Sequence, residues 1–99
     1  MNINRCDKTN RVVFELNGRL DTMTSLMLQN SIMDEFENAS HVVLDLKHIA
    51  HISSMGLRAF LSGEKVAQAK GLKQTLVNVS ESVMEVLRVT GLNKVLTVE

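Results

Sequence analysis

Two adjacent hydroxyl side chains, those of Ser53 and Ser54, stand between a predicted buried strand and a predicted helix. On spacing alone, the favoured interpretation of Ser54 is a helix N-cap, whose oxygen accepts a backbone N–H bond and contributes ~1 kcal/mol. The alternative is a phosphorylation switch, because the unpaired N–H groups and partial positive charge of a helix start tolerate a phosphate. A partner that fits a neutral hydroxyl would then be repelled by the added charge.

Patterns for other chemistry are weak. His41, His48 and His51 have no cysteine or acidic cluster at ligand spacing, so we expect no metal site. The sequence lacks the G-x-S-x-G, P-loop and G-x-G-x-x-G motifs, and His51 precedes Ser54 without a third member of a catalytic triad. Cys6 lacks the pattern of basic neighbours typical of a nucleophile. We therefore expect a protein that is not an enzyme and that carries no cofactor.

Length and composition predict one globular domain over residues 1–99. The 11 basic and 11 acidic residues cancel, so no basic stripe favours nucleic acid as a partner. No basic amphipathic helix or apolar run of ~20 residues favours direct membrane insertion. The single cysteine fits a reducing compartment, and the amino terminus has no apolar run typical of a signal peptide. We expect a cytoplasmic location.

Alternation of apolar and polar residues predicts the strands. Val12, Phe14 and Leu16 share one face, and residues 3–6 are expected to pair with this strand across a turn at residues 7–10. Residues 41–46 are apolar on both faces, as in a buried parallel strand. Further strands are expected at residues 75–79 and 95–98. The exposed edge near Ile3 is open to pairing with a second copy, although no residue requires it.

Helical periodicity predicts three helices. The first, over residues 23–36, is expected to begin at a cap on Asp21, Thr22 or Thr24. Ser82 and Glu85 have the capping-box spacing that opens the third helix, and a glycine follows each of the last two helices. The three apolar stripes comprise, in order, Leu26, Leu28, Ile32, Met33 and Phe36; Leu57, Phe60, Leu61 and Ala67; and Val83, Val86, Leu87 and Thr90.

The resulting element order is β-β-α-β-α-β-α-β. Strands that alternate with helices predict an α/β fold with a mixed, mostly parallel sheet of about five strands and helices packed on it. In such sheets, ligands and partners meet the loops that leave the carboxyl ends of the strands. The loop with Ser53 and Ser54 is one of these.

Three segments together resemble the STAS domain, and more narrowly the bacterial anti-sigma factor antagonists. They are Gly18-Arg19-Leu20-Asp21, Val43-Leu44-Asp45-Leu46, and Ile52-Ser53-Ser54-Met55-Gly56-Leu57-Arg58. Leu87-Arg88-Val89-Thr90-Gly91-Leu92 is similar to the closing helix and turn of that family, so the resemblance covers essentially the whole chain.

The resemblance implies a partner-switching mechanism. The unmodified antagonist binds an anti-sigma factor that is also a serine kinase and thereby frees the sigma factor. The kinase phosphorylates a serine that matches Ser54 here, with Ser53 as the less favoured acceptor, and a serine phosphatase later removes the phosphate. Many members have Asp where this chain has Ser53, and Ser or Thr where it has Met55. These departures bear on kinase recognition more than on docking.

The predicted docking surface surrounds Ser54. Asp21 matches an acidic position of the family, with a helix cap as the simpler interpretation, and Gly18 fits a turn. Met23 and Met27 lie one turn apart outside the apolar stripe, where flexible thioethers suit an adaptable interface and simple exposure is the alternative. The residues predicted to form the docking surface are Gly18, Asp21, Met23, Met27, Ser53, Ser54, Met55 and Arg58. The same fold also fits a non-phosphorylated accessory subunit of a lipid transporter or a stress-signalling scaffold.

Overall fold

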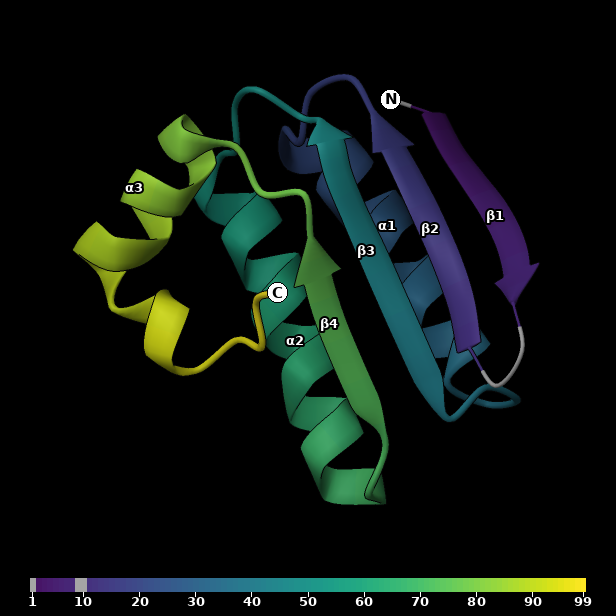
Figure 1. Ribbon diagram of the computed structural model, residues 1–99. Helices are drawn as coiled ribbons and strands as arrows, with labels where there is room; N and C mark the ends of the chain where they lie inside the picture. Colours follow the sequence, from purple (N-terminus) through teal and green to yellow (C-terminus); the bar gives the residue numbers. More distant parts are fainter. Residues whose placement is uncertain (1, 9–10) are drawn as a thin grey trace.

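A computed structural model describes residues 2–8 and 11–99 and shows a four-stranded sheet with helices on one face (Figure 1). The strands are β1 (Asn2–Lys8), β2 (Arg11–Asn17), β3 (His41–His48) and β4 (Lys73–Val77), in that spatial order. β1 runs antiparallel to β2, and β2, β3 and β4 are parallel, as predicted. Of the turn predicted at residues 7–10, Asp7 and Lys8 belong instead to β1, and Thr9 and Asn10 lie outside the described residues.

The helices α1 (Thr22–Glu35) and α2 (Ser54–Lys70) cover the rear face of the sheet in Figure 1. The third helix, α3 (Glu81–Thr90), lies on the far side of α2 from α1. The opposite face of the sheet carries no helix within the described residues. No described helix has both the length and the apolar character needed to cross a bilayer.

The hydrophobic core lies between the sheet and its two covering helices. Val12, Phe14 and Leu16 are all buried, which confirms the alternating pattern of β2. β3 is buried on both faces through Val42, Val43, Leu44 and Leu46. Fully burying an aliphatic side chain of this size stabilises the fold by about 1.5–3 kcal/mol, so these strands are firmly held.

The buried face of α1 differs from the predicted stripe. Ser25, Leu28, Ile32 and the C-cap residue Phe36 are buried, whereas Leu26 is 46% exposed and Met33 is only half-buried. At 3.6 residues per turn, Leu26 lies about 160° around the helix from Leu28 and therefore points away from the core. The prediction that Leu26 belongs to the core is wrong.

The boundaries after α2 also shift. Gly71 ends α2 in the left-handed conformation, as predicted. β4 ends two residues earlier than expected because Asn78 has a φ of 55°, which turns the backbone out of the strand. The cap of α3 is Ser80, whose Oγ accepts the Val83 N–H at 3.3 Å, and the predicted capping box at Ser82 is wrong.

The predicted fifth strand is reduced to a single bridge, between Leu76 and Val98. The chain first forms the short 3-10 helix η1 (Leu92–Lys94), and Leu92 accepts backbone bonds from Val95 and Leu96, which leaves the start of the predicted strand in a turn. Residues 97–99 then run beside β4 through two backbone bonds with Leu76. The sheet therefore has four strands, with the end of the chain against its β4 edge.

Candidate functional site

The start of α2 is capped by Ser53, and not by Ser54 as the favoured interpretation predicted. Ser53 has an extended backbone, and its Oγ accepts the Gly56 N–H at 3.2 Å. Its carbonyl accepts the Leu57 N–H at 3.1 Å, which closes the first helical turn. The N-cap sits one residue earlier because this is where the chain leaves the extended conformation.

Ser54 is the first residue inside α2, and it is exposed. Its hydroxyl has no hydrogen-bond partner among the described residues. The first backbone N–H groups of a helix have no partner within that helix, and they carry the positive end of its dipole. A modification of Ser54 would therefore leave the cap intact, whereas a modification of Ser53 would displace the bond to Gly56.

The loop before α2 is joined directly to the loop before α1. The Ser53 N–H donates to the Leu20 carbonyl at 3.1 Å, and Leu20 and Ile52 form a parallel bridge beyond the ends of β2 and β3. Leu20 is buried beneath this contact. The structure thus brings the segment from Gly18 to Asp21 against the serine loop.

Gly56 permits the close contact between the two loops. A Cβ atom on Gly56 would lie 2.7 Å from Ile52 Cγ1 and 3.0 Å from Leu20 Cβ, closer than carbon atoms normally approach. Only glycine fits here without movement of the neighbouring chain. The glycine that follows the serines therefore helps to hold Ser54 beside the neighbouring loop.

Replacing Gly56 with alanine is expected to lower the free energy of unfolding by about 1–3 kcal/mol, because the added methyl overpacks this contact. Urea denaturation monitored by circular dichroism measures the change. Lys65→Ala, at an exposed position on the same helix, is the control and should change stability by less than about 0.5 kcal/mol. Equal stability of Gly56→Ala and the native protein would contradict this role of Gly56.

Asp21 caps α1 and presents a charge beside the serine loop. Its Oδ1 accepts the Thr24 N–H at 3.0 Å, and the Asp21 N–H donates to Thr24 Oγ1 at 3.0 Å, a reciprocal capping box. The Thr24 N–H and the Thr24 hydroxyl both donate to the Asp21 carboxylate and lower its pKa below the ordinary value of 3.8, so the carboxylate is charged at neutral pH. Gly18, with a φ of 116°, makes the turn that leads into this loop.

The first two turns of α1 carry an exposed apolar surface, the methionine face, formed by Met23, Leu26 and Met27. Met23 is 70% exposed and Met27 is 53% exposed, so both lie outside the core as predicted, and Leu26 joins them. The positions i, i+3 and i+4 share one side of a helix. Leu26 was not predicted here, because it falls within the broad apolar stripe of this helix that the sequence assigns to the core.

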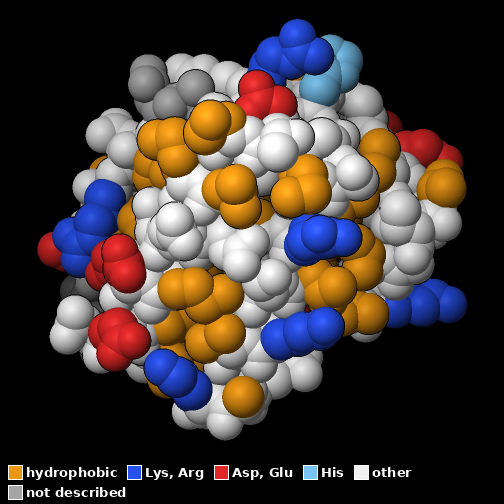
Figure 2. Space-filling view, turned by 180° about the vertical axis from the view of Figure 1, so that it is seen from behind, with side chains coloured by type: hydrophobic (Ala, Val, Ile, Leu, Met, Phe, Trp, Pro, Cys, Tyr) orange, Lys and Arg blue, Asp and Glu red, His pale blue; other side chains and the backbone are white. Residues whose placement is uncertain are grey.

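The methionine face lies at the same end of the helical layer as the start of α2. The two helices begin at the two bonded loops and pack side by side, with half-buried Met55 and exposed Arg58 in the first turns of α2. Figure 2 shows this helix-covered side, where hydrophobic side chains form separate groups among Lys and Arg. Met23, Met27, Met55 and Arg58 therefore lie at the same end of the helical layer as Ser54.

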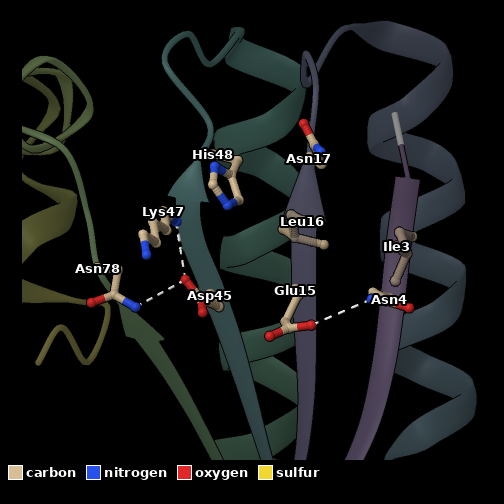
Figure 3. A pocket seen from close by; sticks show the side chains of 9 residues that line it. All are labelled: Ile3, Asn4, Glu15, Leu16, Asn17, Asp45, Lys47, His48 and Asn78. Atoms are coloured by element: carbon tan, nitrogen blue, oxygen red, sulfur yellow. Dashed lines mark hydrogen bonds between the residues drawn. The ribbon is translucent and has the colours of Figure 1, made fainter.

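A polar hollow of about 780 Å³ lies on the opposite, helix-free face of the sheet (Figure 3). There Asp45 Oδ1 accepts the Lys47 N–H and the Asn78 amide, each at 3.0 Å, and Glu15 accepts a bond from Asn4. Two carboxylates beside one lysine do not favour an anion. Within residues 2–8 and 11–99, no three His, Cys, Asp or Glu side chains form a metal-binding group. The hollow faces away from the helical layer, so we assign it no part in the serine site.

Comparison with known proteins places these features in context. The family model of the STAS domain matches residues 2–99. The chain is 26% identical to the anti-sigma-B factor antagonist of Bacillus subtilis, over 99% of this chain and 92% of that protein. It is 28% identical to the anti-sigma F factor antagonist of Paenibacillus polymyxa, over 88% of this chain and 76% of that protein.

Solved structures of the anti-sigma factor antagonist SpoIIAA share the fold. The unphosphorylated form superimposes with a TM-score of 0.82 at 19% identity, over 99% of this chain and 88% of that chain. The phosphorylated form, from Bacillus, gives a TM-score of 0.77 at 19% identity, over 99% of this chain and 91% of that chain. At this level of identity, the similarity establishes the fold.

Proposed function

The chain belongs to the STAS domain family, and on that premise we propose that it is an anti-sigma factor antagonist of the cytoplasm that works by partner switching. Its unphosphorylated form binds an anti-sigma factor that is also a serine kinase, and so frees a sigma factor. Phosphorylation of Ser54 ends this binding, and a serine phosphatase restores it. Ser54 is the substrate of the kinase in this proposal and not a catalyst.

The observation that carries the proposal is the exposed Ser54 hydroxyl, one residue inside α2 and free of the capping bond. A kinase needs access to the acceptor oxygen, and Ser54 offers it without any bond having to break. Ser53 is also a serine, but its Oγ is occupied by the Gly56 N–H. This difference favours Ser54 as the acceptor.

The departure at Ser53 from the family pattern has a structural explanation. Asp and Ser are both among the best N-cap residues, because each places an oxygen near the first free N–H groups. Ser53 performs this capping here, so the replacement of Asp keeps the start of α2 and the position of Ser54. The change removes one negative charge from beside the acceptor. The departure therefore affects docking less than kinase recognition in this proposal.

The surface around Ser54 has the composition of a protein interface. The methionine face supplies apolar area, and Asp21 and Arg58 add one charge of each sign near the starts of α1 and α2. Apolar groups with a charged surround are typical of docking sites, and methionine adapts to the shape of its partner. Gly18 and Ser53, from the two bonded loops, and Met55, from the first turn of α2, complete this surface.

The experiment that tests the acceptor is incubation with the cognate anti-sigma kinase and ATP, followed by mass spectrometry of the peptides. We expect one phosphate, on Ser54, and none on Ser54→Ala. Ser53→Asp is a matched control, because it retains the cap and restores the residue common in the family, and it should still be phosphorylated on Ser54. Phosphate on Ser53, or no phosphate from a kinase that is active on a control antagonist, would reject Ser54 as the acceptor.

A further inference from the structure

The outer edge of β1 is open. β1 stands at one end of the strand order, and no strand pairs with its outer side among the described residues. The β4 edge differs, because residues 97–99 run beside it. Edge strands with free backbone groups are templates for pairing with another chain, and charged residues on the edge restrict which pairings form. β1 carries Arg5, Asp7 and Lys8, all exposed.

The register of β1 against β2 fixes which of its backbone groups face outward. Lys8 pairs with Arg11 across a two-residue connection, and the closing pair of such a hairpin is hydrogen-bonded. Hydrogen-bonded pairs alternate along an antiparallel ladder, so Asn4, Cys6 and Lys8 bond to β2. The N–H and C=O groups of Ile3, Arg5 and Asp7 therefore point to the open edge.

In a symmetric antiparallel dimer, the outward-facing residues of β1 in one copy pair with the outward-facing residues of β1 in the other copy. Few registers satisfy this condition. A two-fold axis at Arg5 or at Asp7 sets like charges directly opposite each other, which is unfavourable. An axis at Cys6 sets each Arg5 opposite Asp7 of the other copy, twice by symmetry. Both side chains lie on the helix-covered side of β1, where Arg5 binds Glu35 at 2.7 Å and Asp7 of its own strand at 3.0 Å. In the paired form, the contact between Arg5 and Asp7 within each strand is exchanged for the same contact between copies.

We propose that two copies of this chain pair through β1 in the register centred on Cys6, forming one continuous eight-stranded sheet with all covering helices on the same side. This contact uses a surface separate from the start of α2, so it goes beyond the proposed switch. Its ladder is short, and the pairing is therefore concentration-dependent. Among the registers centred on Arg5, Cys6 and Asp7, only the one centred on Cys6 sets opposite charges opposite each other, and this complementarity favours a second copy as the occupant of the edge.

Cys6, the one cysteine of the sequence, reports this register. In the proposed pairing, the two Cys6 residues form a non-hydrogen-bonded pair with Cα atoms about 4.5 Å apart, within the range that a disulfide spans. Diamide, added as the oxidant, accepts the two hydrogen atoms of the thiols as the S–S bond forms. We expect rapid cross-linking of the native chain, and a dimer in sedimentation velocity experiments under reducing conditions at high concentration.

Moved cysteines provide the matched controls. In a Cys6→Ser background, Asn4→Cys and Lys8→Cys should each cross-link slowly alone and rapidly when mixed, because Asn4 faces Lys8 of the other copy. Asp7→Arg, which sets like charges opposite each other, should raise the dimer Kd by about tenfold or more. The proposal is overturned if all cysteine positions cross-link at one rate, if Asp7→Arg leaves the Kd unchanged, or if the reduced protein is monomeric at every concentration.

Discussion

Replacing Ser54 with aspartate is expected to weaken binding to the cognate anti-sigma factor by about 100-fold, whereas Ser54→Ala should bind as the native chain does. The exposed hydroxyl of Ser54 is neutral, so a partner surface that fits it does not need a group that binds a carboxylate. A negative charge there must be desolvated and meets any acidic group of the partner. Isothermal titration calorimetry with the purified anti-sigma factor measures the two affinities.

The charge at Ser54 should act on the partner and leave the fold stable. The residue lies in the first turn of α2, where the helix dipole favours negative charge, and Arg58 lies one turn further along on an exposed position. Ser40→Asp is the matched control, because Ser40 is exposed and precedes β3 at the other end of the sheet. Equal affinities of Ser54→Asp and Ser40→Asp would contradict the switch.

Local patterns in the sequence were sufficient for most of the fold. The alternation of Val12, Phe14 and Leu16 gave β2 correctly, and Gly71 gave the end of α2, because each depends on neighbouring residues alone. The predicted last strand failed for the same reason. A short apolar segment such as residues 95–98 satisfies the strand pattern, but backbone bonds to Leu92 hold its start in a turn.

The geometry of the candidate site depends on contacts between distant parts of the chain. Two adjacent serines have equal propensity to cap a helix, and the sequence does not determine which of them has the extended backbone. The choice of Ser53 follows from its backbone bond to Leu20, and the close contact at Gly56 follows from the same pairing. The resemblance to a family points to this loop, and only the three-dimensional structure separates the cap from the exposed hydroxyl.

Replacing Met23 and Met27 together with glutamate is expected to weaken binding to the anti-sigma factor by about 100-fold or more. Fully burying one methionine side chain at an interface contributes about 1.5–3 kcal/mol, and the double variant removes two such contacts and adds two charges. Met23 and Met27 are exposed in the free chain, so the variant should unfold in urea at the native midpoint. Titration calorimetry reports the affinity.

Two controls separate apolar docking from a general effect of surface charge. Met23→Leu with Met27→Leu keeps the apolar area and should bind within about tenfold of the native chain. Val89→Glu places a charge on α3, at a large apolar residue that is 78% exposed. Because α2 lies between α3 and α1, this variant should not change the affinity. If the double glutamate variant folds normally and binds as tightly as Val89→Glu, the methionine face is simply exposed. The double glutamate variant could instead lose affinity while the kinase still phosphorylates Ser54. In that case the methionine face is needed for the stable complex but not for access of the kinase to the hydroxyl.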